Sequence, residues 1–322
     1  MGKRSIIELE KIILRHKKLY YEGHPKISDL EYDDLEQKLS LLDPDNYVLR
    51  LVGFSTKNSS KIKHETKMLS LDKKYDEDEL FDWAGDKLLV GTKKIDGVSC
   101  SLSYDGGILR LAKTRGNGEF GENITLKCEW IPSLPKSIAF EKLVEVRGEI
   151  YCTFENFKKL KDKMIEMGED EPTSARNIVA GLMGRKEKLF LCEYLDFQAF
   201  DIVQKNEMFE KEIQIFKMLE GNGFMTPDYE LLTSPKSISE FINRTKKFID
   251  TGDYLIDGAV FTINDLDVHK VLGETSHHPK YKMAFKFRSK SESSQLKSIE
   301  WNISRQGVYT PVGLIDPIEL SG

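Results

Sequence analysis

The sequence predicts an α+β protein in which a small helical N-terminal part precedes a longer strand-rich part. Apolar residues recur at near-helical spacing over residues 5–22, and a capping signal opens a second helix at Ser28. From about residue 88 to residue 200, apolar and polar residues alternate as they do in strands, with turn signals between them. Two more strand patterns follow late in the chain, at 256–263 and 282–287.

The first helix should be amphipathic and should end at Gly23, with Pro25 shortly after it. Ser28 and Glu31 fit a capping box, in which each side chain accepts a hydrogen bond from the backbone N–H of the other residue. A second helix is therefore predicted from Ser28 onwards. The polar stretch 46–68 that follows it is typical of a linker.

The two predicted helices carry a group of polar and aromatic side chains. Asp29, Tyr32 and Asp33 fall at positions i, i+3 and i+4 of the second helix and therefore project together. They form either a solvated acidic face or, with Tyr20 and Tyr21 near the end of the first helix, an aromatic and acidic pocket.

Length, charge and cysteine spacing limit the classes of protein that this chain can belong to. The 322 residues give room for two or three domains, and a net charge of -5 argues against a strongly basic DNA-binding protein. The four cysteines are scattered without a C-x-x-C pair, so we expect reduced thiols. No apolar run approaches the roughly 18 residues of a membrane span, and the start lacks an apolar signal core. We therefore expect a cytoplasmic protein without membrane contact.

One lysine stands at the end of an apolar run, in the stretch Thr92-Lys93-Lys94-Ile95-Asp96-Gly97. Side chains alternate along a strand, which places Lys94 and Asp96 on one face and Ile95 on the other. The residues alone leave two interpretations open. Lys94 is either an exposed lysine before a turn or an amine that the strand delivers into a site.

A glycine-rich segment surrounds Arg115, in Thr114-Arg115-Gly116-Asn117-Gly118. Closely spaced glycines allow a ligand to approach the backbone, and the guanidinium suits a phosphate, although a long polar turn has the same composition. In the strand pattern 144–150, alternation places Glu145, Arg147 and Glu149 on one face. That face either contacts solvent or lines a cleft.

The strand pattern 282–287 places Lys286 and Ala284 on the face opposite Phe285. A lysine that faces inward requires an anionic partner, because an unpaired buried charge is costly. The pattern therefore predicts Lys286 as a phosphate ligand.

Taken in order, these motifs resemble those of the covalent nucleotidyltransferases, and specifically of the NAD-dependent DNA ligases. The N-terminal pattern His16-x-x-x-Tyr20-Tyr21, followed by Ser28-Asp29-x-Glu31-Tyr32-Asp33, is specific to the NAD-dependent branch. The other shared motifs are Lys94-x-Asp96-Gly97, Thr114-Arg115-Gly116-Asn117-Gly118, Val146-Arg147-Gly148-Glu149, Asp257-Gly258 and Ala284-Phe285-Lys286-Phe287. The resemblance covers nearly the whole chain.

This resemblance implies three structural parts. They are a helical domain at 1–68 that binds nicotinamide mononucleotide (NMN), a nucleotidyltransferase domain of ATP-grasp-like antiparallel sheets at 69–288, and a linker with the first strands of an OB-fold at 289–322. Ligases of this family continue into further domains, one of which holds zinc. We therefore expect this chain to be an adenylation fragment without zinc.

The resemblance also implies a reaction. The amine of Lys94 attacks the α-phosphorus of NAD, NMN leaves, and a lysyl-AMP phosphoramidate remains. Asp96, Glu149 and a Mg²⁺ ion near Glu149 would orient the reacting groups, while Arg115 and Lys286 neutralise phosphate charge. AMP would later pass to the 5'-phosphate at a nick in double-stranded DNA, in replication and repair.

Residues that bind the adenylyl half of NAD follow from the same resemblance. Phe200 should stack on the adenine, Ser70, Leu71 and Thr92 should line the adenine site, and Arg176 should contact the nicked DNA.

The NMN half of NAD should be held by five residues of the N-terminal helices. An acidic pair suits this half, because it carries a cationic nicotinamide ring and ribose hydroxyls that need acceptors. The five residues are Tyr20, Tyr21, Asp29, Tyr32 and Asp33.

Two residues near the nucleotide depart from the family pattern, and the arginine usually found shortly after the Ala-Gly step is displaced to Arg185. Thr92 stands where family members commonly have a glutamate that contacts the adenine amino group, and Thr262 stands where they usually have a lysine. Thr92 can still accept a hydrogen bond, whereas Thr262 removes a charge near the nucleotide. We expect these changes to affect the rate of adenylation and the affinity for the nucleotide.

We expect a monomer that adenylates itself and does not seal nicks efficiently, because the DNA-clamping surface of a complete ligase would lie mainly in C-terminal domains outside this chain. Two other hypotheses remain open. An ATP-dependent or GTP-dependent nucleotidyltransferase would leave the N-terminal helical module without a purpose, and a non-catalytic module would bind dinucleotide or DNA without turnover. Covalent modification of Lys94 distinguishes these hypotheses.

Overall fold

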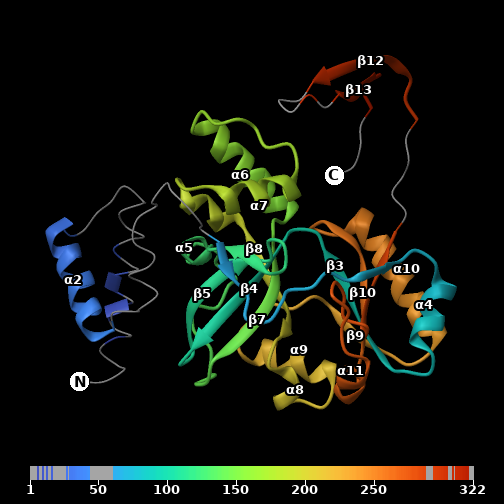
Figure 1. Ribbon diagram of the computed structural model, residues 1–322, viewed down its shortest axis with the longest axis horizontal. Helices are drawn as coiled ribbons and strands as arrows, with labels where there is room; N and C mark the ends of the chain where they lie inside the picture. Colours follow the sequence, from blue (N-terminus) through green and yellow to red (C-terminus); the bar gives the residue numbers. More distant parts are fainter. Residues whose placement is uncertain are drawn as a thin grey trace. The chain divides into compact units, whose positions relative to one another are not determined.

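The structure is a computed structural model (Figure 1). The residues that it describes are 29–43, 61–287, 293–303 and 309–318, together with Ile6, Leu9, Glu10, Ile12, Ile13, His16, Ile27 and Gly307. The chain divides into two compact units, residues 1–286 and residues 287–322. The second predicted helix is present as α2 (Asp29–Leu42).

The first unit contains a five-stranded sheet with the strand order β2-β11-β10-β3-β9. Its strands are β2 (Asp72–Lys74), β3 (Leu89–Ile95), β9 (Tyr229–Leu232), β10 (Ile256–Ile263) and β11 (Lys282–Lys286). Neighbouring strands are antiparallel except β2, which runs parallel to β11. The central strand β10 therefore lies between the strand of Lys94 and the strand of Lys286.

A four-stranded antiparallel sheet forms the other half of this unit, with the order β5-β4-β7-β8. Its strands are β4 (Val98–Asp105), β5 (Ile108–Thr114), β7 (Val144–Tyr151) and β8 (Asp196–Ile202). The predicted turn at 105–107 joins β4 to β5 as a hairpin. A short two-stranded sheet pairs β1 (Lys61–Lys63) with β6 (Phe120–Glu122).

Helices pack on the sheets of this unit, and Figure 1 shows α10 (Pro235–Thr251) alongside β3 and β10. Its start follows from the sequence, because the hydroxyl of Ser234 accepts a hydrogen bond from the backbone N–H of Ser237 and Pro235 occupies the first helical position. Further helices are α4 (Glu77–Ala84), α5 (Thr125–Cys128), α6 (Phe154–Glu166), α7 (Ala175–Gly184), α8 (Lys205–Met208), α9 (Glu212–Gly221), α11 (Leu266–Leu272) and a 3-10 helix at Leu189–Tyr194.

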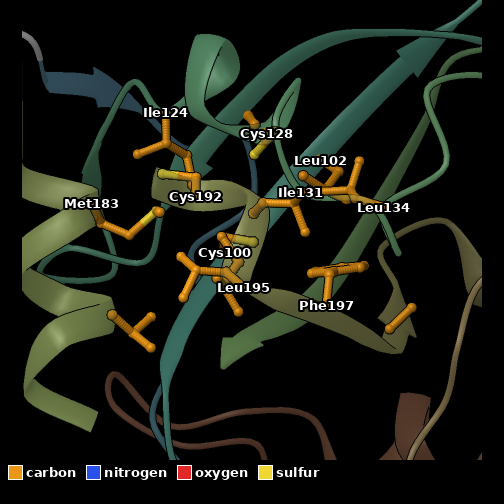
Figure 2. Packing of buried hydrophobic residues seen from close by; sticks show 14 of the residues in the cluster. Cys100, Leu102, Ile124, Cys128, Ile131, Leu134, Met183, Cys192, Leu195 and Phe197 are labelled. Atoms are coloured by element: carbon orange, nitrogen blue, oxygen red, sulfur yellow. The ribbon is translucent and has the colours of Figure 1, made fainter. Parts of the chain in front are cut away.

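A buried apolar core packs the four-stranded sheet against α5, α6 and α7. Phe197 of β8 lies fully inside it, as the alternation of that strand predicts. All four cysteines are buried and unpaired, which agrees with the expected thiols, and Figure 2 shows Cys100, Cys128 and Cys192 in this core. None of the helices in the described part of the chain is long and apolar enough to cross a membrane.

The sequence pattern over 206–222 predicts one continuous helix, and the structure shows that this extent is wrong. The structure has two helices there, α8 and α9, with an interruption at 209–211. Lys211 has extended backbone at the start of α9, and the amide oxygen of Gln214 accepts hydrogen bonds from the backbone N–H groups of Glu210 and Lys211. These side-chain bonds begin a new helix in place of a continuous one.

The second unit contains a two-stranded antiparallel sheet of β12 (Leu296–Ile303) and β13 (Tyr309–Ile315). The side chains of both strands are exposed, among them Trp301 and Ile299. The OB-fold and the three domain boundaries expected from the sequence stay predictions.

Candidate active site

A cavity of about 660 Å³ lies in the first unit, and both large sheets contribute to its wall. β3, β10 and β11 come from the five-stranded sheet, and β4, β7 and β8 come from the four-stranded sheet. The cavity brings together the predicted residues Lys94, Asp96, Glu149, Lys286, Ser70, Leu71, Thr92, Arg115, Phe200 and Arg176. Their individual roles stay predictions.

Lys94 reaches the cavity because it shares a strand face with Thr92 and Asp96, as the period of two predicts. The strand register places Gly258 of β10 opposite Lys94 on one side and opposite Lys286 on the other. Two lysines on strands far apart in the sequence therefore face the same part of the cavity.

Asp257 links these two lysines. Its carboxylate lies 2.9 Å from Lys94 Nζ and 2.7 Å from Lys286 Nζ, and each of the three side chains is about three-quarters buried. Burial alone would raise the pKa of Asp257, but the two ammonium groups outweigh this effect and lower the pKa. The group is a carboxylate with two cations, so this end of the cavity carries a net positive charge suited to phosphate.

Asp96 follows Lys94 on the same strand face and pairs with Arg176, at 3.0 Å from the guanidinium Nε. Burial is the main cause that raises the pKa of Asp96, and Arg176 opposes it. Arg176 lies in the first turn of α7, which the hydroxyl of Ser174 caps. Its side chain is 55% exposed, so it remains accessible to a ligand at the mouth of the cavity.

Glu149 lies deeper, on β7, with only 9% of its surface exposed. Its carboxylate accepts hydrogen bonds from the hydroxyl of Ser99 at 2.6 Å and from the backbone N–H of Gly97 at 3.2 Å. Burial raises the pKa of Glu149 to about 7, while Ser99 and Lys94 counteract part of the increase. This carboxyl is therefore close to half ionised at neutral pH.

Two residues of the charged face of β7, Arg147 and Glu149, line the cavity, so of the two interpretations of 144–150 the cleft is correct. Glu145 and Glu149 are buried, and Arg147 pairs with Glu145 at 3.2 Å. Arg147 also donates hydrogen bonds to the backbone oxygens of Thr66 and Lys67, which holds the segment before Ser70 against the sheet.

Arg115 lies in the turn that follows β5. Gly116 has φ of +56°, and a Cβ added there would lie 1.9 Å from the carbonyl oxygen of Phe120, so this turn requires glycine. The backbone N–H of Arg115 donates to the oxygen of Ser99 at 2.8 Å, which anchors the turn to β4. The glycine-rich segment therefore forms part of the cavity wall.

Phe200 reaches the cavity through an irregularity of β8. Arg147 pairs with Asp201 and Gly148 pairs with Ala199, so Phe200 is one extra residue between two pairs, a β-bulge. The bulge allows the consecutive side chains Phe200 and Asp201 both to line the cavity, whereas strict alternation would place them on opposite faces.

Five of the predicted residues cannot be placed in this way. Tyr20 and Tyr21 lie outside the described residues. Asp29, Tyr32 and Asp33 belong to α2, but their side chains also lie outside the described part of the structure. The predicted pocket for the NMN half of NAD stays a prediction.

The predicted site residues did not include Asp257, Asp201 and Lys282, which also line the cavity. The Asp257-Gly258 motif was visible in the sequence, but the contact of Asp257 with two lysines depends on the pairing of β10 with β3 and β11. Asp201 faces the cavity because of the bulge, and Lys282 shares with Lys286 the strand face that was already recognised. The spacing of Lys282 could therefore have identified it.

Comparison with known proteins agrees with this geometry. Residues 56–290 match the model of the NAD-dependent DNA ligase adenylation domain. The chain is similar to the DNA ligase of Halothermothrix orenii, with 31% identity over 99% of this chain and 51% of the relative. It is also similar to the DNA ligase of Caldicellulosiruptor bescii, with 32% identity over 99% of this chain and 50% of the relative.

The chain thus spans about half the length of the curated relatives that it matches. Among solved structures, a Lig E DNA ligase matches with 14% identity and a TM-score of 0.43, over 76% of this chain and 83% of that chain, and no conclusion rests on so low a score. The match to the family model covers more than two-thirds of the sequence and includes every described cavity residue named above. This chain therefore belongs to the family of NAD-dependent DNA ligase adenylation domains.

Proposed function

We propose that this chain transfers AMP from NAD to its own Lys94. A bond forms between Nζ of Lys94 and the α-phosphorus, the bond from that phosphorus to the oxygen of NMN breaks, and the amine releases a proton. The observation that carries this proposal is the convergence of Lys94 and Lys286 on Asp257 inside a cavity lined by Arg115 and Phe200.

The residues of the cavity support separate parts of this reaction. Lys286 and Arg115 supply positive charge where the phosphates gain negative charge in the transition state. Asp257 holds the amine of Lys94 close to that of Lys286. Asp96 and Glu149 lie on the cavity wall near Lys94 and would orient the amine and the ribose.

Magnesium is the metal expected for this reaction, and it would neutralise phosphate charge. No group of three or more His, Cys, Asp or Glu side chains suited to a metal occurs among the described residues. Mg²⁺ commonly binds through one or two carboxylates together with substrate phosphates, so it does not need such a group. Glu149 or Asp96 would supply the carboxylate, and we propose that the metal arrives with NAD.

We further propose that the AMP passes to the 5'-phosphate of nicked double-stranded DNA and that the chain works as a monomer in the cytoplasm. The names of the curated relatives support DNA as the final acceptor. The exposed guanidinium of Arg176 at the cavity mouth supports it as a contact to the nick. Adenylation without efficient sealing is expected of these 322 residues.

The test of this proposal is a search for one AMP adduct by intact mass. The chain is incubated with Mg²⁺ and either NAD or ATP, after a check that the purified protein was not already adenylated. We expect an adduct from NAD alone, and Lys94→Ala should abolish it. Lys93→Ala is the matched control, because Lys93 lies next to Lys94 on the opposite strand face.

Two outcomes contradict the proposal. An adduct from ATP alone would assign the chain to an ATP-dependent mechanism. No adduct from either nucleotide would favour a non-catalytic module that binds dinucleotide or DNA.

A further inference from the structure

A further ion pair lines the cavity, away from Lys94 along the five-stranded sheet. Lys282 begins β11, and its Nζ lies 3.0 Å from the carboxylate of Asp201 on β8. Both side chains line the cavity, although they are only 10% and 18% exposed. The pair therefore joins the two sheets at the cavity wall.

Behind this pair lie two more charged residues, Lys205 and Glu212. Lys205 is 3.0 Å from Asp201 and 3.3 Å from Glu212, and Glu212 is 3.4 Å from Lys282. The cluster holds two positive and two negative groups, and within it only Asp201 and Lys282 line the cavity. Lys205 and Glu212 support the cluster from the protein side.

The cluster keeps the carboxyl of Asp201 ionised. Burial alone would raise the pKa of Asp201, but Lys205 and Lys282 outweigh burial and lower the pKa below its usual range. Asp201 is thus a hydrogen-bond acceptor with lone pairs to spare. The ammonium of Lys282 has three N–H donors, and its two ion pairs within the described residues leave one for a ligand.

The register of the sheet shows where this pair lies relative to the reacting lysines. Lys286, Ala284 and Lys282 follow one another along the cavity face of β11, so Lys282 is four residues from Lys286. Four residues of strand span about 13 Å. This is close to the length of an extended nucleoside monophosphate. A phosphate at Lys286 would place the base near Lys282.

The same end of the cavity carries the two departures from the family pattern. Thr92 and Thr262 both line it, where the resemblance leads one to expect a glutamate and a lysine. Thr262 of β10 is the direct cross-strand partner of Lys282. The ammonium of Lys282 thus lies one strand away from Thr262, the position where the family usually has a lysine. The carboxylate of Asp201 lies beside this ammonium.

A carboxylate and an ammonium side by side match the hydrogen-bonding edge of adenine. The 6-amino group of adenine donates, and its ring nitrogen N1 accepts. Hypoxanthine reverses both, because its O6 accepts and its N1–H donates. We propose that Asp201 accepts from the 6-amino group and Lys282 donates to N1, so that this pair selects adenine; this assignment rests on the proposed function of the cavity.

The test compares adenine with hypoxanthine nucleotides in the complete chain. AMP and IMP binding is measured by calorimetry in a Lys94→Ala background, which keeps covalent AMP out of the cavity. Adduct formation in the unchanged chain is measured with NAD and with nicotinamide hypoxanthine dinucleotide. We expect a preference for adenine of about 100-fold in both measurements, since buried polar groups reject a base that leaves them unpaired.

Variants separate recognition from support of the fold. Lys282→Met and Asp201→Asn should reduce the preference to less than about 10-fold. Lys205→Arg retains the positive charge behind the cavity wall, so it should keep the preference. The double variant Thr262→Lys/Lys282→Thr places the ammonium on β10 in place of β11. It should restore most of the adenine preference that Lys282→Met loses.

The outcomes test the adenine assignment and the adenylation of Lys94 separately. Equal binding of AMP and IMP, or an equal loss of preference in Lys205→Arg and Lys282→Met, overturns the adenine assignment. Equal adduct formation from both dinucleotides overturns it while the adenylation of Lys94 stands. A preference for AMP without any adduct supports the assignment and overturns the proposed reaction.

Discussion

Glu149 combines a buried position with hydrogen bonds that favour its charged form. Its pKa is about 7 in the folded chain and 4.5 in the absence of the fold. Between pH 4.5 and 7 the unfolded chain has released this proton while the folded chain still holds it. The stability of the fold therefore falls as the pH rises through this window, by about 3 kcal/mol in total.

The substitution Glu149→Gln removes this titration. The free energy of unfolding of the variant relative to the unchanged chain should therefore increase by about 2 kcal/mol between pH 5 and pH 8. Urea unfolding at both pH values measures this double difference. Glu155→Gln is the control, because Glu155 is an exposed glutamate on α6 whose pKa is lowered by Lys159. A relative stability of Glu149→Gln that does not change with pH would contradict the assigned pKa.

At the scale of elements, the site depends on the close approach of β10 to β11. Gly258 lies between Lys94 and Lys286 in the sheet, and a Cβ added there would lie 2.1 Å from the carbonyl oxygen of Phe285. This contact is with backbone and cannot be relieved by a rotamer change. A side chain at this position must separate the two strands and move Lys286 relative to Lys94.

Gly258→Ala should therefore destabilise the fold by about 3 kcal/mol and slow adduct formation from NAD. Gly181→Ala is the matched control, because Gly181 lies in α7 with open space around its Cα. This control should stabilise the fold by about 0.5 kcal/mol through helix propensity. Thermal unfolding of both variants checks the contrast, and equal stability of the two would show that β10 and β11 can separate without cost.

Alternation along single strands was enough to predict much of the site. It placed Lys94 with Asp96, and Lys286 with Ala284, on faces that the structure turns to the cavity. It could not place Asp201, since a bulge shifts the alternation of β8 by one residue. It also could not show that Asp257 contacts two lysines, because that contact depends on strand pairing across more than 150 residues of chain.

Helix boundaries could likewise be predicted only where a local signal in the sequence sets them. The sequence also predicts a short helix at 76–83, which agrees with α4 within one residue, because Asp76 is a local cap whose side chain accepts a hydrogen bond from the backbone N–H of Asp78. The predicted helix at 206–222 is interrupted, and α8 begins at Lys205, whose side chain belongs to the buried cluster with Asp201 and Glu212. A tertiary ion-pair cluster of this kind leaves no periodic pattern in the sequence.

At the scale of the whole molecule, the net charge predicts weak DNA binding by this chain. The net charge is -5 over 322 residues, and the chain spans about half the length of its curated relatives. Affinity for DNA comes largely from lysine and arginine that displace counterions from phosphates. A chain with a net negative charge should bind nicked DNA weakly and with a shallow dependence on salt.

Adenylation of Lys94 should therefore be faster than sealing of a nick. With NAD and Mg²⁺, we expect the Lys94 adduct to form at least about 100-fold faster than a labelled nicked duplex is sealed at 200 mM salt. Lowering the salt to 50 mM should raise the sealing rate more than the adenylation rate, because only sealing requires a DNA contact. Single-turnover assays of both steps in one reaction measure these rates, with an intact duplex as control. Sealing as fast as adenylation at 200 mM salt would show that these 322 residues already form a complete DNA-binding surface.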